Sequence, residues 1–435
     1  MTDRLRIAMV ALDFDRQGGS EGRTGQLVDA LLAAGHEVHL IGARIRGAWD
    51  PRTILHPVRC ASRPRWLEVV QFSRRAATVV RRESFDIVHN QIRPFVPGVV
   101  TVGGGCHRFY LQEVLPLEKG RLVAGLKRAS ALHLALLALE RAGYRPDRCP
   151  YIIANSSLGR DGILRYYPMP PERVVVAYNG VDAGRFSPEA RGRWRAERRL
   201  ALGVGPEDLL VLFVGTGFAR KGLAPLLAAL ARLCDRGLAP HLAVIGSGSA
   251  RPWQRRAAGL GLGDRVRFAG RVADPERYYA AADVFALPTF FDPFANATLE
   301  AMASGLPVVT SRQNGAAEIL RPGVDGLVVD RPDDVDGLAE ALASLADPAT
   351  RSALGEQARQ TALRFPWERP LERTLEVYRE VTRAASRETR AERRETRDER
   401  RGGRAERREL RDARRETRAE SREGRAEGGE PRGES

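Results

Sequence analysis

Residues 209–234 read LLVLFVGTGFARKGLAPLLAALARLC, and this stretch decides the fold. The apolar run Leu209–Val214 is typical of a buried strand, and a glycine-bearing loop and a helix-like segment, Ala224–Cys234, follow it directly. A buried strand that leads through a short loop into a helix is the unit from which parallel sheets with crossover helices are built. The same order recurs along most of the chain.

Strand-like and helix-like segments alternate in two series, which together predict two doubly wound α/β domains. In the first series, strands are expected at Ile7–Leu12, Val38–Ile41, Ile87–His89, Val99–Val102, Ile152–Ala154 and Val174–Ala177, and helices at Thr24–Ala34, Trp66–Arg82 and Leu111–Ala142. In the second series, strands are expected at Leu209–Val214, His241–Ile245, Val266–Ala269, Val284–Leu287, Val308–Thr310 and Gly326–Val329, and helices at Ala224–Cys234, Pro275–Ala282 and Ala295–Ala303.

The domain boundaries follow changes in composition. We expect a first domain over residues 1–180, a polar connection with a small helix over 181–208, and a second domain over 209–365. Apolar residues at helical spacing predict an amphipathic helix over 366–382 that packs back on the first domain. Residues 383–435 are predicted to be a charged tail, disordered or partly helical, because their seven-residue repeats contain almost no apolar position beyond Leu410.

Composition and cysteine spacing exclude several classes of protein. The sequence of 435 residues is 43% hydrophobic, but it contains no uninterrupted apolar run of the roughly 18 residues that a transmembrane helix needs. The short apolar run near the N-terminus lacks a signal-peptide cleavage site, so we expect a cytoplasmic protein. The four cysteines are widely scattered, which argues against a disulfide framework and a zinc site.

The formal net charge is +15, and most of it belongs to the part that is expected to fold. From Arg383 onward, 18 arginines stand against 14 acidic residues, so the tail is nearly neutral. A basic body favours anionic partners, such as a phospholipid surface, a phosphorylated glycolipid or a nucleotide. The tail has no aromatic residue that could stack on bases, which disfavours a nucleic-acid partner.

Four glycine-bearing loops follow predicted strands, and together they favour a phosphorylated ligand, since glycine lets a ligand approach the backbone closely. Two of these loops deliver side chains: Gly103–His107 ends in a histidine, and Gly215–Gly222 carries Arg220 and Lys221 just ahead of a helix. The others contain Gly18 and Gly19, and Gly246. None of the four matches a P-loop or a dinucleotide fingerprint.

Two pairs of acidic residues stand out. Asp13 and Asp15 form a DxD sequence at the end of the first strand, where turn chemistry is favoured over a metal site. Asp292 and Glu300 lie in FDPFANATLEAMASGLPVV, residues 291–309. Asp292 could cap the following helix, and Glu300 could be a solvated helical residue. However, Glu300 has apolar neighbours, and a carboxylate near packed surface generally has a partner.

These residues resemble the Glu-x7-Glu segment of glycosyltransferase family 4, which are retaining enzymes of the GT-B fold, with two Rossmann-like domains that face each other across a cleft. Three further segments resemble the family: Asn179–Asp182 with Phe186, the loop Gly215–Lys221, and Asn314–Glu318 with Gly323 and Gly326. Residues 291–300 look most like those of bacterial enzymes that add glucose or a related hexose to the lipopolysaccharide core. The resemblance covers roughly residues 1–382.

The resemblance implies roles for individual residues. Arg220 and Lys221 would hold the donor diphosphate, and Glu300 would bind the ribose hydroxyls. Asp292, where the family usually has Glu, would face the transferred sugar, and His107 would lie near the reacting centre unless it is only a turn residue. The donor site is also expected to include Gly18, Gly19, Gly215, Gly246, Asn296, Ala297 and Thr298.

The implied activity is metal-independent transfer of a hexose, glucose first, from a UDP-linked sugar to a lipopolysaccharide-core or other glycan or glycolipid acceptor, with retained configuration and no cofactor. The acceptor and the basic body together suggest peripheral contact with the inner face of the cytoplasmic membrane. Two alternatives stay open: a nucleotide-sugar-binding scaffold without transfer activity, and another GT-B enzyme such as a nucleotide-sugar epimerase.

Overall fold

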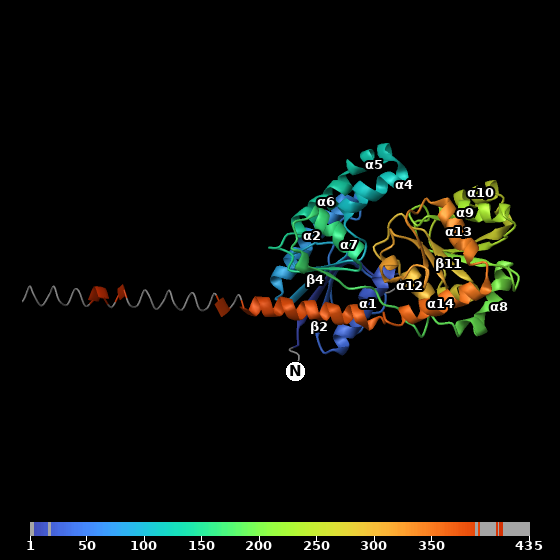
Figure 1. The fold of residues 1–435 in the computed structure, drawn as a ribbon. Helices are drawn as coiled ribbons and strands as arrows, with labels where there is room; N and C mark the ends of the chain where they lie inside the picture. Colours follow the sequence, from blue (N-terminus) through green and yellow to red (C-terminus); the bar gives the residue numbers. More distant parts are fainter. Residues whose placement is uncertain (1–3, 16–18, 388–389, 392–405, 408, 412–435) are drawn as a thin grey trace, which may run out of the picture. The chain divides into compact units, whose positions relative to one another are not determined.

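The computed structural model describes residues 4–15, 19–387, 390–391, 406–407 and 409–411 (Figure 1). Contacts between Cα atoms group the chain into two compact units, residues 1–377 and residues 378–435. The first unit contains two parallel sheets with their helices, which we call the first lobe (β1–β7) and the second lobe (β8–β13). The two α/β domains predicted from the sequence are therefore confirmed.

The first lobe has a seven-stranded sheet in the order β3-β2-β1-β4-β5-β6-β7, with every pair parallel. Its strands are β1 (Arg6–Phe14), β2 (Glu37–Ile45), β3 (Ile54–Pro57), β4 (Ile87–Gln91), β5 (Val99–Val102), β6 (Ile152–Ala154) and β7 (Val174–Val176). Six of the seven were expected. The strand β3 was missed because it is a four-residue edge strand with exposed Ile54 and Leu55, so it lacks the buried apolar run of the others.

The helices of the first lobe differ from expectation at residues 110–143, and a further helix at residues 157–166 was not expected. They are α1 (Gly19–Ala33), α2 (Arg65–Arg82), α3 (His107–Phe109), the π-helical turn η1 (Tyr110–Val114), α4 (Leu115–Lys119), α5 (Arg121–Arg128), α6 (Ala131–Gly143), α7 (Ser157–Tyr166) and the short η2 (Pro171–Arg173). The single helix expected at Leu111–Ala142 was wrong. Gly120 has a φ of 80°, which ends α4, and the Ser130 side chain caps α6 by accepting a hydrogen bond from the backbone of His133.

The second lobe has a six-stranded parallel sheet in the order β10-β9-β8-β11-β12-β13. Its strands are β8 (Leu210–Val214), β9 (His241–Ile245), β10 (Val266–Gly270), β11 (Val284–Leu287), β12 (Val308–Ser311) and β13 (Leu327–Val329). Its helices are α8 (Ala190–Leu202), α9 (Leu223–Asp235), α10 (Arg251–Gly259), η3 (Gly263–Arg265), α11 (Pro275–Ala281), α12 (Asn296–Ala303), η4 (Gly315–Ile319), α13 (Val335–Ser344) and α14 (Pro348–Ala362).

Helix α8, which lies in the predicted connection, is anchored to the second lobe by a buried ion pair. Arg199 is 2% exposed, and its guanidinium donates to Asp283 Oδ2 at 3.0 Å. Arg195 donates to the other oxygen of Asp283 at 2.6 Å. Burial opposes ionisation of Asp283, but a backbone hydrogen bond from Leu210 and the two arginines outweigh it and lower its pKa.

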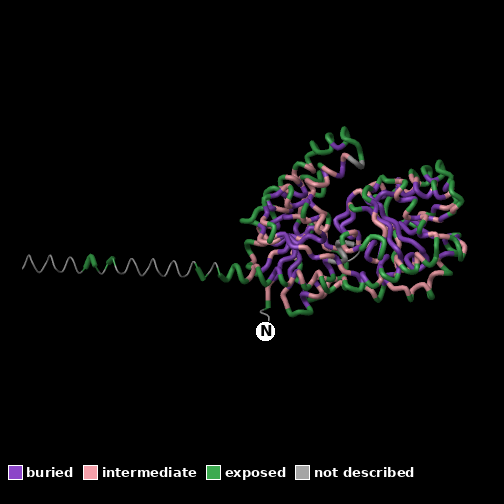
Figure 2. Tube along the Cα trace, in the orientation of Figure 1, coloured by how far each residue is buried: buried purple, intermediate pink, exposed green. Residues whose placement is uncertain are grey.

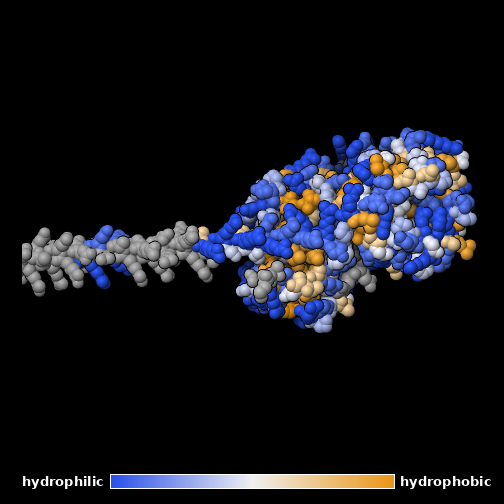
Figure 3. Space-filling view, turned by 60° about the horizontal axis from the view of Figure 1, so that its bottom comes forward, coloured by the Kyte–Doolittle hydropathy of each residue, from blue (hydrophilic) through white to orange (hydrophobic). Residues whose placement is uncertain are grey.

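Buried residues gather in the strands of both sheets and in the helix faces that cover them (Figure 2). Hydrophilic side chains cover much of the folded surface, with smaller hydrophobic patches between them (Figure 3). Beyond α14, the chain is helical over residues 368–387. Most of the predicted tail, residues 383–435, lies outside the described residues.

Candidate functional site

The carboxyl ends of the strands in both lobes border one pocket of about 630 Å³, which we call the charged pocket. Four basic or acidic side chains line it: Arg220, Lys221, Asp292 and Glu300. Its other lining residues are Gly103, Gly104 and Tyr110 of the first lobe, and Val214, Gly215, Thr216, Phe291, Pro293, Phe294, Ala295, Asn296 and Ala297 of the second. The ends of parallel strands are where open α/β sheets bind their ligands.

The loop between β8 and α9 depends on glycines because other backbone segments approach it closely. Gly222 has a φ of 80°, and a Cβ there would lie 1.8 Å from the Pro288 carbonyl oxygen. Gly246, at the end of β9, has a φ of 135°, and its Cβ would lie 1.9 Å from the Gly215 carbonyl oxygen. Gly246 therefore supports the wall of the charged pocket without lining it.

The two cations of this loop converge on Asp292. The Lys221 ammonium forms an ion pair with Asp292 Oδ2, and the Arg220 guanidinium lies 3.5 Å from the same oxygen. Arg220 also donates to the Phe291 carbonyl oxygen, which holds its side chain across the pocket wall. Because β8 and β11 are neighbours in the sheet, their loops bring together residues 71 positions apart in the sequence.

The backbone fixes the position of Asp292 and the surrounding charge keeps it ionised. Its Oδ1 accepts from the Phe294 N–H at 3.1 Å, and its own N–H donates to the Gln313 carbonyl oxygen at 2.9 Å. Burial opposes ionisation, but the Lys221 and Arg220 charges outweigh it, so the pKa of Asp292 is lowered. Asp292 thus stays a carboxylate at the foot of the charged pocket.

Glu300 has the partner that its apolar neighbours predicted. It lies on α12, and its Oε2 accepts from the Tyr279 hydroxyl at 2.8 Å. Burial raises the pKa of Glu300, and the hydrogen bond from Tyr279 opposes that rise. The two carboxylates of the pocket therefore differ: Asp292 is held ionised by cations, whereas Glu300 has no cation within salt-bridge distance among the described residues.

The start of α12 separates pocket-lining residues from supporting ones. Asn296 and Ala297 line the pocket, and Asn296 Oδ1 accepts from Asn179 Nδ2 at 2.6 Å. Thr298 is fully buried and does not line it. Its hydroxyl accepts from Asn314 Nδ2 at 2.9 Å, so the geometry gives the Thr298 side chain a supporting position.

The side-chain amide of Asn314 links the residues around the start of α12 through hydrogen bonds. Its Oδ1 accepts from the N–H groups of Ala295 and Ala316, both at 3.1 Å, and its Nδ2 also donates to Thr310. It is fully buried. The sequence signalled Asn314 only as part of the loop that resembles the family, and it gave no sign of the Tyr279 hydroxyl, because helix α11 carries no motif.

His107 lies at the start of α3 and does not line the charged pocket. Its Nε2 is 2.9 Å from Nδ1 of His133 on α6, and its N–H donates to Glu140 Oε1 at 2.8 Å. Burial, with the nearby Arg93 and His133, lowers the pKa of His107 to about 3, so the ring is neutral at pH 7. Tyr110, one turn later, is the residue of this segment that reaches the pocket.

The first glycine loop is only partly described. Gly18 lies outside the described residues, and Gly19 is the first residue of α1. Asp13, of the DxD sequence, pairs with Arg44, whose Nη2 lies 2.8 Å from Asp13 Oδ2. In the ranges that the structure describes, no group of three or more His, Cys, Asp or Glu residues could hold a metal ion.

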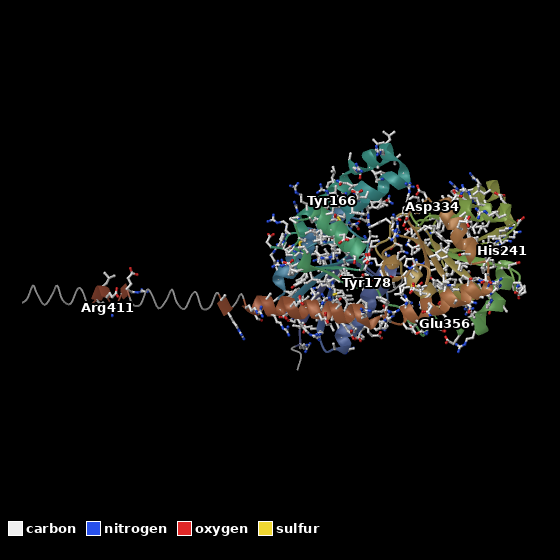
Figure 4. The ribbon with its side chains drawn as sticks, in the orientation of Figure 1. Tyr166, Tyr178, His241, Asp334, Glu356 and Arg411 are labelled. Carbon is white, nitrogen blue, oxygen red and sulfur yellow. The ribbon has the colours of Figure 1, made fainter. Side chains whose placement is uncertain are left out.

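One carboxylate joins the two lobes directly. Glu318, from η4 of the second lobe, accepts from the N–H groups of Ser157 and Leu158 at 2.8 and 2.7 Å, at the N-terminus of α7 in the first lobe. Its Oε2 also accepts from the Tyr178 hydroxyl at 3.1 Å (Figure 4 labels Tyr178). A carboxylate at a helix N-terminus is favoured by the helix dipole and by free N–H groups.

Two family models match the chain. The model described as Glycosyltransferase Family 4 matches residues 17–185, and the model described as Glycosyl transferases group 1 matches residues 208–347. D-inositol 3-phosphate glycosyltransferase from Corynebacterium kroppenstedtii is 33% identical over 248 residues, which are 54% of this chain and 54% of that protein. The match to the D-inositol 3-phosphate glycosyltransferases thus spans about half of their length.

Solved structures show the fold. WaaG, a glycosyltransferase involved in lipopolysaccharide biosynthesis, has a TM-score of 0.72 and 23% identity, and the match covers 84% of this chain and 98% of that one. Anabaena HepE in complex with UDP-glucose has a TM-score of 0.62 and 18% identity, and covers 88% of this chain and 100% of that one. The fold is GT-B, as the resemblance implied.

Proposed function

Because this chain belongs to the glycosyltransferases, with a Family 4 domain over residues 17–185 and a group 1 domain over 208–347, we propose that it is a retaining hexosyltransferase. It would transfer a hexose, glucose in the first instance, from a UDP-linked donor to a glycan or glycolipid acceptor such as a lipopolysaccharide core. The observation that carries the proposal is the single pocket lined by Arg220, Lys221, Asp292 and Glu300.

The charged pocket offers what breaking a bond between an anomeric carbon and a diphosphate requires. Negative charge develops on the departing phosphate, and Arg220 and Lys221 can neutralise it in place of a metal ion. Lys221 is already paired with Asp292, so a bound diphosphate would share or take over this cation. Asp292 would then accept hydrogen bonds from the transferred sugar, and Glu300 from the ribose hydroxyls.

Retention would follow from attack on the face that the leaving group occupies. The acceptor oxygen forms a bond to the anomeric carbon, the bond to the diphosphate oxygen breaks, and the acceptor proton passes to the departing phosphate. No protein nucleophile is needed in this scheme. The residues then act by position and charge, since effective concentration and electrostatic stabilisation supply most of the acceleration.

The donor is the first point to test. A thermal-shift panel of UDP-, GDP- and ADP-linked sugars on the full chain should show stabilisation by one nucleotide class, because a ligand bound only by the folded state raises its stability. The stabilising donor is then assayed with and without acceptor. Product formed without acceptor would point to the epimerase alternative, and binding without turnover on any acceptor would point to the scaffold alternative.

We also propose that the protein acts at the inner face of the cytoplasmic membrane and that α5 makes the contact. Leu122 and Leu126, one turn apart on α5, are 81% and 71% exposed. Arg121 and Lys127 lie on the same helix and form no ion pair among the described residues, and Figure 1 places α5 at an outer margin of the first lobe. Exposed leucines beside free cations favour an anionic lipid surface.

Vesicle binding tests this contact. The wild type should sediment with vesicles that contain phosphatidylglycerol, less with phosphatidylcholine alone, and less as salt rises. The double variant L122S/L126S should lose this binding, whereas L200S, which removes a leucine 82% exposed on α8, should keep it. Equal binding of all three proteins would overturn the role of α5. Among the described residues no single helix is long and apolar enough to cross a membrane. Helices α5 and α6, which meet at a bend of 71°, together have the length and apolar composition of a span.

A further inference from the structure

A second cavity opens at the carboxyl end of the first sheet, and we call it the uncharged cavity. Its volume is about 100 Å³. The ends of β4, β5 and β6 form one wall, α1 forms another, and Trp367, Leu371 and Thr374 close it. None of its described lining residues carries a charge, although the charged pocket is directly adjacent through Gly103, which lines both.

Two buried amide side chains in the wall leave hydrogen-bonding atoms without partners. Gln91 is 7% exposed and Asn155 is 3% exposed. Among the described residues, Gln91 Nε2 and Asn155 Oδ1 have no hydrogen-bond partner. A buried polar group without a partner destabilises the fold, so two such groups in one small cavity indicate that a ligand supplies the missing bonds.

The orientation of each amide follows from its other bond. Asn155 Nδ2 donates to the Gly103 carbonyl oxygen at 3.2 Å, which leaves Oδ1 as the free acceptor. Gln91 Oε1 accepts from the Thr24 hydroxyl at 3.4 Å, which leaves Nε2 as the free donor. The cavity thus presents one donor and one acceptor, which is the pattern that complements hydroxyl groups, since each hydroxyl both donates and accepts.

Backbone strain marks the same place. Ile92, which follows Gln91 and lines the cavity, has a φ of 73°. A β-branched residue in this region is a strained outlier, and such residues cluster at ligand sites. It is the single non-glycine residue with positive φ in the described chain.

We propose that the uncharged cavity binds a small uncharged diol, with Gln91 Nε2 donating to one hydroxyl and Asn155 Oδ1 accepting from another. Size supports this class, because about 100 Å³ is less than the roughly 150 Å³ of a cavity that holds benzene, and suits two or three waters or a three-carbon polyol. Trp367 would contact the carbon skeleton. A charged ligand is disfavoured, since burying an ion without a partner is costly.

The diol could be a free polyol or the hydroxylated end of the acceptor. The second source would be within reach of the charged pocket, because Asn179, which lines the cavity, donates to Asn296, which lines the pocket. Only this second source rests on the proposed transfer reaction. Binding in the cavity does not.

Fluorine NMR of the full chain labelled with 5-fluorotryptophan tests the site. The sequence has five tryptophans, and the variant W367F assigns the resonance of Trp367. Titration with glycerol should shift this resonance saturably, with a dissociation constant on the order of 10 mM for so small a ligand, while Trp253 on α10 stays unchanged. Propan-1-ol and glycerol 3-phosphate should bind at least about tenfold more weakly.

Matched variants separate the site from general effects. Q91M removes the free donor and should weaken glycerol binding about three- to tenfold. T53V removes another buried hydroxyl that has no partner among the described residues and does not line the cavity, so it should leave binding unchanged. T53V should keep or gain stability, because it removes only an unsatisfied polar atom. Q91M also removes the acceptor of the Thr24 hydroxyl, so its gain from losing the unsatisfied donor should be partly or fully offset.

Several outcomes would overturn the proposal. One is a linear drift of all five resonances, which would mean that water alone fills the cavity. The others are equal shifts with propan-1-ol, tighter binding of glycerol 3-phosphate than of glycerol, and wild-type affinity in Q91M. The two sources are told apart in the transfer assay: competition of glycerol with the acceptor identifies the acceptor end, and its absence identifies a separate polyol. If transfer is never observed, the titration still decides the binding site.

Discussion

The charged pocket and the uncharged cavity both lie at strand ends and share Gly103, yet they handle polar groups in opposite ways. In the charged pocket, Lys221 and Arg220 converge on Asp292, so charges neutralise one another without a ligand. In the uncharged cavity, Gln91 and Asn155 each leave one atom without a described partner. An unpaired ion in a folded protein costs far more free energy than an unpaired amide, so an amide can stay without a partner when no ligand is bound.

This difference separates two kinds of recognition. A ligand of the charged pocket has to compete with an existing ion pair, so it must itself bring strong negative charge. A ligand of the uncharged cavity competes only with water, so modest hydroxyl groups suffice. Removing a charge from the charged pocket should therefore cause a large loss of activity. Adding a charge to the uncharged cavity should destabilise the fold. Changes at residues that only support either site should have small effects on both.

The largest effect is expected for Lys221→Ala. It removes the cation closest to Asp292 and to the proposed diphosphate, so kcat/KM for transfer should fall about 10²- to 10³-fold, as for loss of one strong charge-stabilising contact. Arg331→Ala, which removes an exposed cation paired with Asp333, is the matched control and should change little. Steady-state kinetics measure both. Full activity of Lys221→Ala would show that the charged pocket is not the catalytic site.

Asn155→Asp should have the next largest effect, by placing a charge in the uncharged cavity. The carboxylate would lack a cation among the described lining residues and would face the Gly103 carbonyl oxygen, so the variant should lose about 2 kcal/mol of unfolding free energy at pH 8. Burial would raise the pKa of the new carboxyl, so the loss should shrink as pH falls.

Urea denaturation at pH 5 and pH 8 measures this effect, with Asn155→Leu as the uncharged comparison. Asn155→Leu should lose less stability than Asn155→Asp at pH 8, and its loss should not depend on pH. Equal stability of Asn155→Asp and wild type at pH 8 would mean that a cation or bulk water reaches the cavity. The claim that only the charged pocket accommodates charge would then be contradicted.

Sequence alone predicted the charged pocket better than the uncharged cavity, and the reason is physical. Arg220, Lys221 and Asp292 follow strands that pair in the sheet, so strand order brings them together whatever their rotamers. The free atoms of Gln91 and Asn155 depend on side-chain orientation, and the positive φ of Ile92 depends on tertiary packing. None of these leaves a periodic signal in the sequence.

The same reasoning explains the errors in the fold. The buried strands were found because short apolar runs alternate regularly with helix-like segments, but the helix expected at Leu111–Ala142 joined four shorter segments. Gly120 and Ser130 were the available signals for its breaks, since glycine and an N-capping serine end and begin helices. The position of the His107 ring beside His133 could not be read from spacing, because it depends on where α6 packs.

Glu300→Gln should lower kcat/KM about tenfold and change its pH dependence. Burial raises the pKa of Glu300, whereas the cations lower that of Asp292, so the two carboxylates titrate in separate ranges. As pH falls through the raised pKa, Glu300 gains a proton and becomes a poorer acceptor for hydroxyls, so wild-type activity should drop. This acid limb should be absent in Glu300→Gln.

The stability of this variant is an internal control. A carboxyl whose folded pKa is raised favours folding when protonated, and that contribution is lost as pH rises through the folded value. Replacing it with glutamine removes the cost of the buried charge, so Glu300→Gln should be as stable as wild type, or more so, at pH 8. If the acid limb of the pH profile persists in this variant, another group is responsible for it.

The smallest effect is expected for Thr298→Val, which tests whether the chemistry is confined to residues that line the charged pocket. Thr298 is fully buried, and its hydroxyl accepts from Asn314 Nδ2. Valine has nearly the same shape, and Asn314 Nδ2 keeps its bond to Thr310, so the variant should lose about 1 kcal/mol of stability, the net value of one hydrogen bond. Its kcat/KM should stay within about threefold of wild type, because no pocket-lining atom moves. A drop as large as that of Lys221→Ala would show that the Asn314 network positions the donor, and that the charged pocket extends beneath α12.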